Sequence, residues 1–361
     1  MSNRETQTLA SLQFDDAYTA LKATINANDK TPQVIMGPPG CAKTSLAVKV
    51  FVDLGIPEDV VKNCIFRPSL RDPVDLVGLP HVERGDNGVL ETHWAANSFI
   101  GYVNRVAEKY GIAPLIVDEV FDCVTMMQNA LAGLMLDRRT GDNVLHDRVF
   151  IVATSNRVSD KSGANRPLTK LTNRCEVWEM RADLEAWSRY MLEQDADPVM
   201  VAYCRFDPGA LDDFDPDRMV NGTMRSWDAA SRIPTDLPEP IYLAKLSGRV
   251  PEARAAQYIA FRKLHELLPT DQEMTTNPMG AKLPVDNRGA LYLAATLAFK
   301  RVTQKTWPAL VKYVERIATE AFAPDIEAAF YKDVVAHKNE FLSTKEFTAW
   351  ATTRGADVTL H

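Results

Sequence analysis

Residues 37–44, with the sequence GPPGCAKT, constrain the fold of this chain more than any other segment. The apolar run 34–36 precedes them and a plausible helix start at residue 45 follows, so the order is strand, glycine-rich turn, helix. Backbone N–H groups of such a turn and of the helix N-terminus carry partial positive charge, which favours an anion. The pattern predicts a phosphate-binding loop; the alternative is an ordinary Gly/Pro turn between a strand and a helix.

The side chains of this loop support the first interpretation. Lys43 would supply a mobile charge for the outer phosphates of a nucleotide, and the Thr44 hydroxyl can ligate Mg²⁺. The usual pattern has Gly immediately before the Lys, whereas this chain has Ala42, which is tolerable at negative φ and impairs function at positive φ. The loop residues expected to bind the nucleotide are Pro38, Pro39, Gly40, Cys41, Ala42, Lys43, Thr44 and Ser45.

Polar residues also end two later apolar runs. Asp118 and Glu119 follow the run 115–117, and Asn156 follows the run 149–153. Nucleotide sites of parallel sheets lie at the carboxyl ends of strands, so Asp118 would hold Mg²⁺ through water and Glu119 would orient and deprotonate the attacking water. Asn156 would position the same water beside the γ-phosphate. The alternatives are an acidic helix cap for the two carboxylates and a turn-forming role for the Asn.

The composition is that of an ordinary globular protein of about two domains. No apolar run of the 361 residues approaches membrane-spanning length, and residues 1–6 do not open a signal peptide. The five cysteines are scattered without CxxC spacing, so we expect reduced thiols in a cytoplasmic protein and no zinc site. A net charge of −7 without a Lys/Arg block weakens the case for extensive nucleic-acid binding.

Continuous apolar runs, which are the expected strands, are separated by segments of helical pattern. This order predicts an α/β fold with a parallel five-stranded sheet between helices. A helix is expected over residues 14–27 and a loop over the proline-containing residues 67–73. The Pro-rich segment 233–240 is expected to be a linker or surface loop, and helical patterns dominate after it, for instance over 290–299 and 307–321. The expected strands are residues 33–36, 64–66, 115–118, 149–153 and 176–180.

Together, the GPPGxxKT loop, the IVDE strand, the ATSN strand and the Arg after it resemble the AAA+ ATPases, in which the first two are the Walker A and Walker B motifs. The finer resemblance is to the MoxR-like branch, where Ala before the loop Lys is common. Residues 72–80 and 136–142 are similar to that branch as well. The resemblance covers most of the chain and is strongest over residues 34–174.

This resemblance implies an ATP- and Mg²⁺-dependent ATPase that works as a chaperone-like homo-oligomeric ring, for which a hexamer is expected. It implies an α/β core over residues 1–185, an all-α lid over 186–300 and a C-terminal helical extension packed on the lid over 301–361. MoxR-like ATPases commonly act with a von Willebrand factor A-domain partner, remodelling protein substrates or assisting metal-cofactor insertion. No membrane insertion is expected.

The resemblance gives Asn156 a counterpart in the family and implies further site residues that rest on the resemblance alone. Asn156 is similar to sensor 1, and Arg174, in the segment LTNR, is similar to the arginine finger that reaches the neighbouring subunit's nucleotide. The family usually continues with Phe where this chain has Cys175, and Arg166 is a competing finger. Arg225 is similar to the sensor 2 residue that contacts nucleotide from the lid. The alternatives are a surface or ion-paired role for Arg174 and packing beside Trp227 for Arg225.

Two segments resemble the remodelling surface of the family. Residues 139–146 place a TGDN turn between β-capable runs, which predicts a hairpin similar to the pre-sensor 1 hairpin. Residues 80–112 resemble the helix 2 insertion, and both segments would project toward the pore of a ring. His93 and Trp94 could grip substrate there, although Trp more often anchors packing.

Two other functions stay open at this point. An AAA+ nucleic-acid motor or loader acting on DNA would need a basic, aromatic-bearing pore or a winged-helix tail. The C-terminal third mixes basic and acidic residues and forms no clear basic stripe. A nucleotide-binding scaffold with little turnover is the third possibility, against which the intact pair Asp118 and Glu119 argues.

Overall fold

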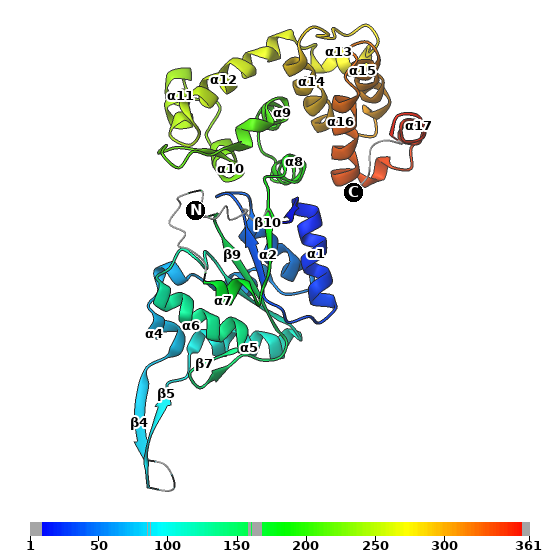
Figure 1. Cartoon of the computed structure of the whole chain (residues 1–361). Coiled ribbons are helices and arrows are strands. Elements are labelled where there is room, and N and C mark those ends of the chain that lie inside the picture. The colour runs from blue at the N-terminus through cyan, green and yellow to red at the C-terminus, as the bar shows by residue number, and fades with distance from the viewer. Residues whose placement is uncertain (1–8, 85, 87, 158–159, 161–167, 356–361) are drawn as a thin grey trace, which may run out of the picture. The chain divides into compact units, whose positions relative to one another are not determined.

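The computed structural model describes residues 9–84, 86, 88–157, 160 and 168–355. The chain divides into two compact units. Met1–Ala182 and Asp215–Asp217 belong to the first, an α/β unit, and Asp183–Phe214 and Arg218–His361 belong to the second, which is mainly helical (Figure 1). No helix in the described part of the chain is long and apolar enough to span a membrane.

The α/β unit is built on one parallel sheet of six strands rather than the five expected. The additional strand is a two-residue edge strand, too short to show a sequence pattern, which pairs with β10 through Ser11↔Glu179 and Leu12↔Met180. Every residue of β6 and β9 is buried, which requires cover on both faces of the sheet. The strand order is β1 (Ser11–Leu12), β10 (Glu176–Met180), β2 (Gln33–Met36), β9 (Val149–Ser155), β6 (Ala113–Val117) and β3 (Ile65–Phe66).

The register of this sheet sets where the strands end. Val34 of β2 and Val117 of β6 both lie opposite Ala153 of β9, so these three strands reach the same edge together. The loop 37–42 therefore leaves the sheet beside Asp118 and Asn156. The helices of this unit are α1 (Phe14–Asn26), α2 (Lys43–Asp53), α3 (Glu58–Lys62), α4 (Pro73–Val77), α5 (Ser98–Tyr110), α6 (Thr125–Leu136) and α7 (Thr169–Thr172).

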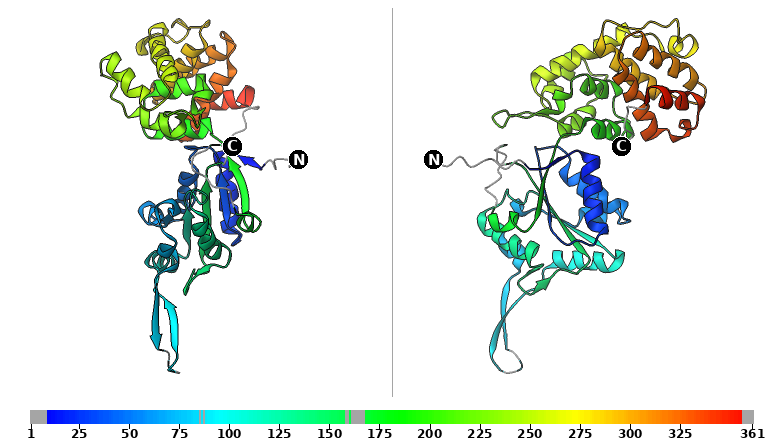
Figure 2. Two further views of the ribbon diagram at one scale, coloured as in Figure 1. Left: turned by 60° about the vertical axis from the view of Figure 1, so that its left-hand side comes forward. Right: turned by 45° about the vertical axis from the view of Figure 1, so that its right-hand side comes forward.

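Two antiparallel hairpins extend from the α/β unit. The longer pairs β4 (Pro80–Arg84) with β5 (Leu90–Trp94), within the segment expected as an insertion, and projects away from the sheet (Figure 2). The shorter pairs β7 (Arg139–Thr140) with β8 (Asn143–Val144), which confirms the hairpin expected over residues 139–146. The segment 67–73 is not wholly loop, because Pro68–Leu70 forms a 3-10 turn and α4 begins at Pro73, where a missing N–H costs nothing.

The second unit is the helical C-terminal part of the fold, and it includes one pair of two-residue strands. Residues 233–238 form a loop inside this unit, and α14 packs on both α9 and α16. The helices are α8 (Leu184–Glu193), α9 (Pro198–Phe206), α10 (Met224–Ser231), α11 (Glu239–Ser247), α12 (Glu252–Arg262), α13 (Asp271–Thr276), α14 (Arg288–Lys300), α15 (Trp307–Thr319), α16 (Pro324–His337) and α17 (Lys345–Thr353), and the strands are β11 (Asp212–Asp213) and β12 (Gly222–Thr223).

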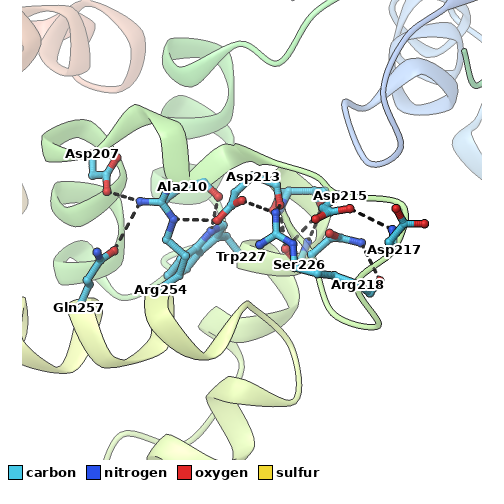
Figure 3. Close-up of polar contacts among 12 residues, drawn as sticks. Asp207, Ala210, Asp213, Asp215, Asp217, Arg218, Ser226, Trp227, Arg254 and Gln257 are labelled. Atoms are coloured by element: carbon cyan, nitrogen blue, oxygen red, sulfur yellow. Dashed lines mark hydrogen bonds and ion pairs between the residues drawn. The ribbon is translucent and has the colours of Figure 1, made fainter. Parts of the chain in front are cut away.

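Charged residues hold this helical unit together at two places. Arg205 of α9 and Asp333 of α16 form a buried two-pronged ion pair at 2.7 and 2.6 Å. Arg254 of α12 donates to Asp207 and, at 2.9 Å, to Asp213 (Figure 3). Both arginines cross between segments distant in sequence, so they fix the packing of helices that local propensity does not specify.

Candidate nucleotide-binding site

The loop 37–42 connects β2 to α2 through a tight path. A Cβ on Gly37 would lie 2.3 Å from the backbone oxygen of Met180, so the neighbouring strand leaves no room for a side chain. Gly40 has φ 78°, a left-handed conformation that favours glycine. Both glycines of the loop are therefore required by geometry: Gly37 by the close approach of the Met180 backbone and Gly40 by its dihedral angle.

The N-terminus of α2 follows this loop directly. The first N–H groups of a helix have no acceptor within the helix, and Ala42 at the N-cap carries no polar side chain to satisfy them. The first turn of α2 also contains no acidic residue. An anion placed in the loop would meet these N–H groups and the positive end of the helix dipole.

Ala42 has φ 69° and ψ 23°, which is the less favourable of the two cases considered from the sequence. An L-residue in this left-handed region costs about 1–2 kcal/mol because its Cβ approaches the following carbonyl oxygen. The loop therefore adopts the conformation that a Gly would adopt, with the strain of a Cβ added. Cys41 beside it is buried, and burial raises the pKa of its thiol.

Lys43 is buried, with 8% of its surface exposed, and its ammonium group is turned into the loop. The Nζ atom donates to the backbone oxygens of Gly37 and Pro38, both at 2.9 Å, and to Asn156 Oδ1 at 3.1 Å. These contacts bring the loop Lys and the expected sensor residue of β9 together. Of the other loop residues, Pro38 is buried, Pro39 is half-buried and Ser45 is exposed on α2.

Asp118 lies at the centre of a cluster of hydroxyl groups. Its Oδ1 accepts hydrogen bonds from Thr44 Oγ1 and Thr154 Oγ1, both at 2.7 Å, and its Oδ2 lies 3.4 Å from Arg67 Nε. Hard cations such as Mg²⁺ prefer hydroxyl and carboxylate oxygens. The adjacent oxygens of Thr44 and Asp118 therefore fit the metal role expected for them.

Glu119 follows in a strained turn. Its φ is 61°, its N–H donates to Thr154 Oγ1 at 3.3 Å, and its Oε2 accepts from Ser69 Oγ at 3.4 Å. The next N–H, that of Val120, donates to the Thr154 backbone oxygen at 2.8 Å. Thr154 therefore holds the turn from two atoms, and it carries Glu119 out of the line of β6 while Asp118 stays at the strand end.

A third carboxylate, Asp122, belongs to this site and was missed from the sequence. Its Oδ2 accepts a hydrogen bond from Asn156 Nδ2 at 3.3 Å. Burial, followed by the nearby charge of Glu119, raises the pKa of Asp122 to about 6. The sequence does show an Asp three residues after Glu119. Its place in the site follows only if the chain turns back there, and this turn depends on the positive φ of Glu119.

The remaining expected residues lie away from these contacts or outside the described residues. Arg174 is exposed between α7 and β10, and Cys175 beside it is half-buried. Arg225 is an exposed residue in the first turn of α10, in the other unit. Arg166 lies outside the described residues. The structure thus brings together Lys43, Thr44, Asp118 and Asn156, whereas the roles of Arg174 and Arg225 stay predictions.

A cavity of about 470 Å³ lies next to the site, beyond the end of β3. Arg67 and Arg71 line it together with apolar side chains that include Leu70, Val74 and Leu79. Arg67 also contacts Asp118, so the same short segment borders both the cavity and the nucleotide-binding loop. Leu70, Val74 and Leu79 are exposed by 51% to 75%, more than expected for side chains of this kind in a packed core.

No family model matches this chain, and no curated protein matches it. Among solved structures, NtrX from Brucella abortus in complex with ADP is 13% identical over 94% of this chain and 68% of its own, with a TM-score of 0.38. Domain III of the Thermotoga maritima replication initiation protein DnaA is 18% identical over 68% of this chain and 90% of its own, with a TM-score of 0.36. C. elegans PCH-2 is 12% identical over 91% of this chain and 69% of its own, with a TM-score of 0.33. Similarities this weak say nothing about the function of this chain.

Proposed function

We propose that this chain is an AAA+ ATPase of the MoxR-like branch that hydrolyses ATP to ADP and phosphate to drive the remodelling or assembly of target proteins. The observation that carries the proposal is the convergence of Lys43, Thr44, Asp118 and Asn156 at the carboxyl ends of β2, β6 and β9. These residues come from three segments that are distant in sequence. Together with the N-terminus of α2, they supply what phosphate binding and metal binding require.

The chemistry proposed for this site is attack of water on the γ-phosphorus. A bond forms between the water oxygen and the phosphorus, the bond from the phosphorus to the β–γ bridging oxygen breaks, and its electron pair leaves with ADP. Glu119 takes the proton of the water and then releases it to solvent. Mg²⁺, held by Thr44 and by Asp118, would neutralise charge on the phosphate oxygens.

Binding of ATP changes the partners of Lys43. Its ammonium group now donates to two backbone oxygens of the loop and to Asn156, and a phosphate oxygen carrying negative charge is the stronger acceptor. Lys43 would therefore move to the phosphate, and the amide oxygen of Asn156 would become available to the attacking water. Lys43 and Asn156 thus act in sequence rather than independently.

The oligomeric part of the proposal is a homo-oligomeric ring, a hexamer, in the cytoplasm. Arg174 would act on the nucleotide of a neighbouring subunit, with Arg166 as its competitor, and Arg225 would contact nucleotide from the lid. The exposure of Arg174 and Arg225 leaves them available for such contacts. The two hairpins, β4–β5 and β7–β8, would contact a protein substrate, and a von Willebrand factor A-domain protein would be the partner.

Steady-state ATP hydrolysis by the purified protein tests this function. Lys43→Ala should abolish binding of a fluorescent ATP analogue, whereas Lys49→Ala on the exposed face of the same helix should not. Glu119→Gln should bind the analogue but hydrolyse ATP about 10²- to 10⁴-fold more slowly, the usual contribution of a general base. Unchanged binding in Lys43→Ala, or near-normal turnover in Glu119→Gln, would contradict the assignment.

Two additions to the assay test the finer parts. Mixing inactive Arg174→Ala subunits with inactive Lys43→Ala subunits should restore some hydrolysis, because Arg174 of a Lys43→Ala subunit then faces the intact loop of an Arg174→Ala subunit. No recovery of hydrolysis after subunit exchange would reject the role of Arg174 in trans. Single- or double-stranded DNA should not stimulate hydrolysis. Strong stimulation that disappears with added salt would instead identify a nucleic-acid motor, since phosphate contacts are salt-sensitive.

A further inference from the structure

The side-chain amide of Asn156 lies between two groups of opposite hydrogen-bonding character. On one side, Lys43 Nζ donates to its oxygen at 3.1 Å, and an ammonium group can only donate. On the other side, Asp122 Oδ2 accepts from its Nδ2 at 3.3 Å, and a carboxylate can only accept. An amide between a donor-only group and an acceptor-only group has a single favourable orientation.

Only one of these two partners stays in place when nucleotide binds. Lys43 would leave Asn156 for a phosphate oxygen, as described above, and the amide would then lose the contact that holds its oxygen. Asp122 belongs to the turn that begins at Glu119, where its N–H donates to the Glu119 backbone oxygen at 3.0 Å. That turn is fixed to β9 through Thr154, so Asp122 keeps its position next to Asn156.

The carboxylate of Asp122 is poorly placed for a purely structural role. Its Oδ1 is buried and has no hydrogen-bond partner among the described residues. Burying a carboxylate oxygen without a partner is unfavourable for folding, and such a group in a native protein calls for an explanation. The raised pKa of Asp122, caused first by burial and then by Glu119, points the same way, because the charged form is disfavoured there.

We propose that Asp122 is a positioning residue for ATP hydrolysis, which holds the Asn156 amide so that its oxygen faces the attacking water after Lys43 has moved to the nucleotide. The proposal rests on the ATPase function proposed above and adds a residue to it. Asp122 acts through Asn156 and does not contact the reacting atoms. Its contribution is therefore to the rate of the chemical step and not to the affinity for ATP.

The test is a double-mutant cycle on hydrolysis. Asp122→Asn keeps the shape of the side chain but offers Asn156 both a donor and an acceptor, so the amide loses its single orientation. We expect kcat to fall roughly tenfold, within the range typical of misaligned catalytic groups, and KM to stay within about twofold. In the background of Asn156→Ala the same change should have no further effect, because the group that Asp122 positions is gone.

The pH dependence of kcat gives a readout that a merely structural role would not move. The charged groups acting on the Asp122 carboxylate are Glu119, Asp118 and Lys43. Protonation of Asp122 would allow it to donate, so the wild-type rate should fall below about pH 6 relative to the rate of Asp122→Asn. Taking the ratio of the two enzymes removes the titration of ATP itself, which both share.

Each outcome of this experiment decides something. Asp137→Asn, at an exposed carboxylate after α6, is the matched control and should leave kcat unchanged. An unchanged kcat in Asp122→Asn, or an equal fall in the wild-type and Asn156→Ala backgrounds, overturns the positioning role and leaves the ATPase intact. Absence of hydrolysis by the wild-type protein, with Glu119→Gln no slower, instead refutes the proposed function itself.

Discussion

Replacing Asp122 by Asn should stabilise the α/β unit at pH 8, although the same change should slow hydrolysis. The pKa of Asp122 is raised to about 6 by burial and by Glu119, whereas an Asp in an unfolded chain has a pKa of about 3.9. The folded state therefore binds the proton more tightly than the unfolded state. The protonated Asp122 therefore stabilises the folded state at low pH. This contribution to the free energy of unfolding decreases as the pH rises from about 4 to 6, and it is absent above that range.

The size of the effect follows from the two pKa values. The difference between the folded and unfolded pKa of Asp122 corresponds to at most about 3 kcal/mol, since each tenfold change in proton affinity is worth about 1.4 kcal/mol. Asp122 is only half-buried, so solvent screening reduces this ceiling, and we expect Asp122→Asn to gain on the order of 1 kcal/mol at pH 8. Near pH 4.5 the gain should shrink to about a third of that, because the folded-state carboxylate is then mostly protonated.

Urea unfolding, followed by pulsed hydrogen exchange and mass spectrometry of peptides from β6 and β9, reports the α/β unit separately from the helical unit. The protein is equilibrated in urea at pH 8 and at pH 4.5, and the midpoints of wild type, Asp122→Asn and the control Asp137→Asn are compared. A destabilised Asp122→Asn at pH 8 would refute the reasoning. So would a gain that is the same at both pH values, because it could not come from the titration of this group.

Two other changes have signs fixed by the structure. Ala42→Gly should slow hydrogen exchange of the α2 amides by up to about fivefold, because the 1–2 kcal/mol of left-handed strain exceeds the 0.4–1 kcal/mol of backbone entropy lost by Gly. The control Ala47→Gly, inside the same helix, should speed exchange. Faster exchange in both variants would contradict the assignment of strain to Ala42. Asp333→Asn should destabilise the helical unit by about 3–5 kcal/mol, because it removes the charged partner that Arg205 contacts at 2.7 and 2.6 Å. Urea midpoints of peptides from α9 and α16 would measure the loss. A loss below about 1 kcal/mol would mean that Glu185, 3.8 Å from Arg205, replaces Asp333.

The strands of the sheet could be predicted where their residues are continuously apolar. The ranges 33–36 and 176–180 match β2 and β10 residue for residue, and the other three expected strands are correct to within two residues at each end. The edge strand β1 could not be found, because two residues give no periodicity. The hairpin β4–β5 escaped as well, since its strands are exposed on both faces except at Trp94 and so lack the alternation of a half-buried strand.

The site was predictable as far as parallel-sheet geometry goes. Strands of one sheet that run in the same direction end at the same edge, which is why Lys43, Asp118 and Asn156 could be expected near one another. The contacts of Thr154 and Ser69 with Glu119 depend on a backbone angle that no side-chain pattern encodes. The interpretation of Ala42 was likewise left conditional on its φ, and the sign of that angle comes only from the structure.

Three features unfavourable for folding gather at one edge of the sheet. Ala42 and Glu119 both have positive φ, and Asp122 holds a buried carboxylate oxygen without a partner among the described residues. Strain of this kind persists only where the surrounding structure over-determines it. For the turn at Glu119, Thr154 supplies that constraint through its hydroxyl and its backbone oxygen. Because relaxation of the turn would separate Asp122 from Asn156, the instability and the proposed catalytic geometry have a common origin, and a variant that gains stability at Asp122 should lose turnover.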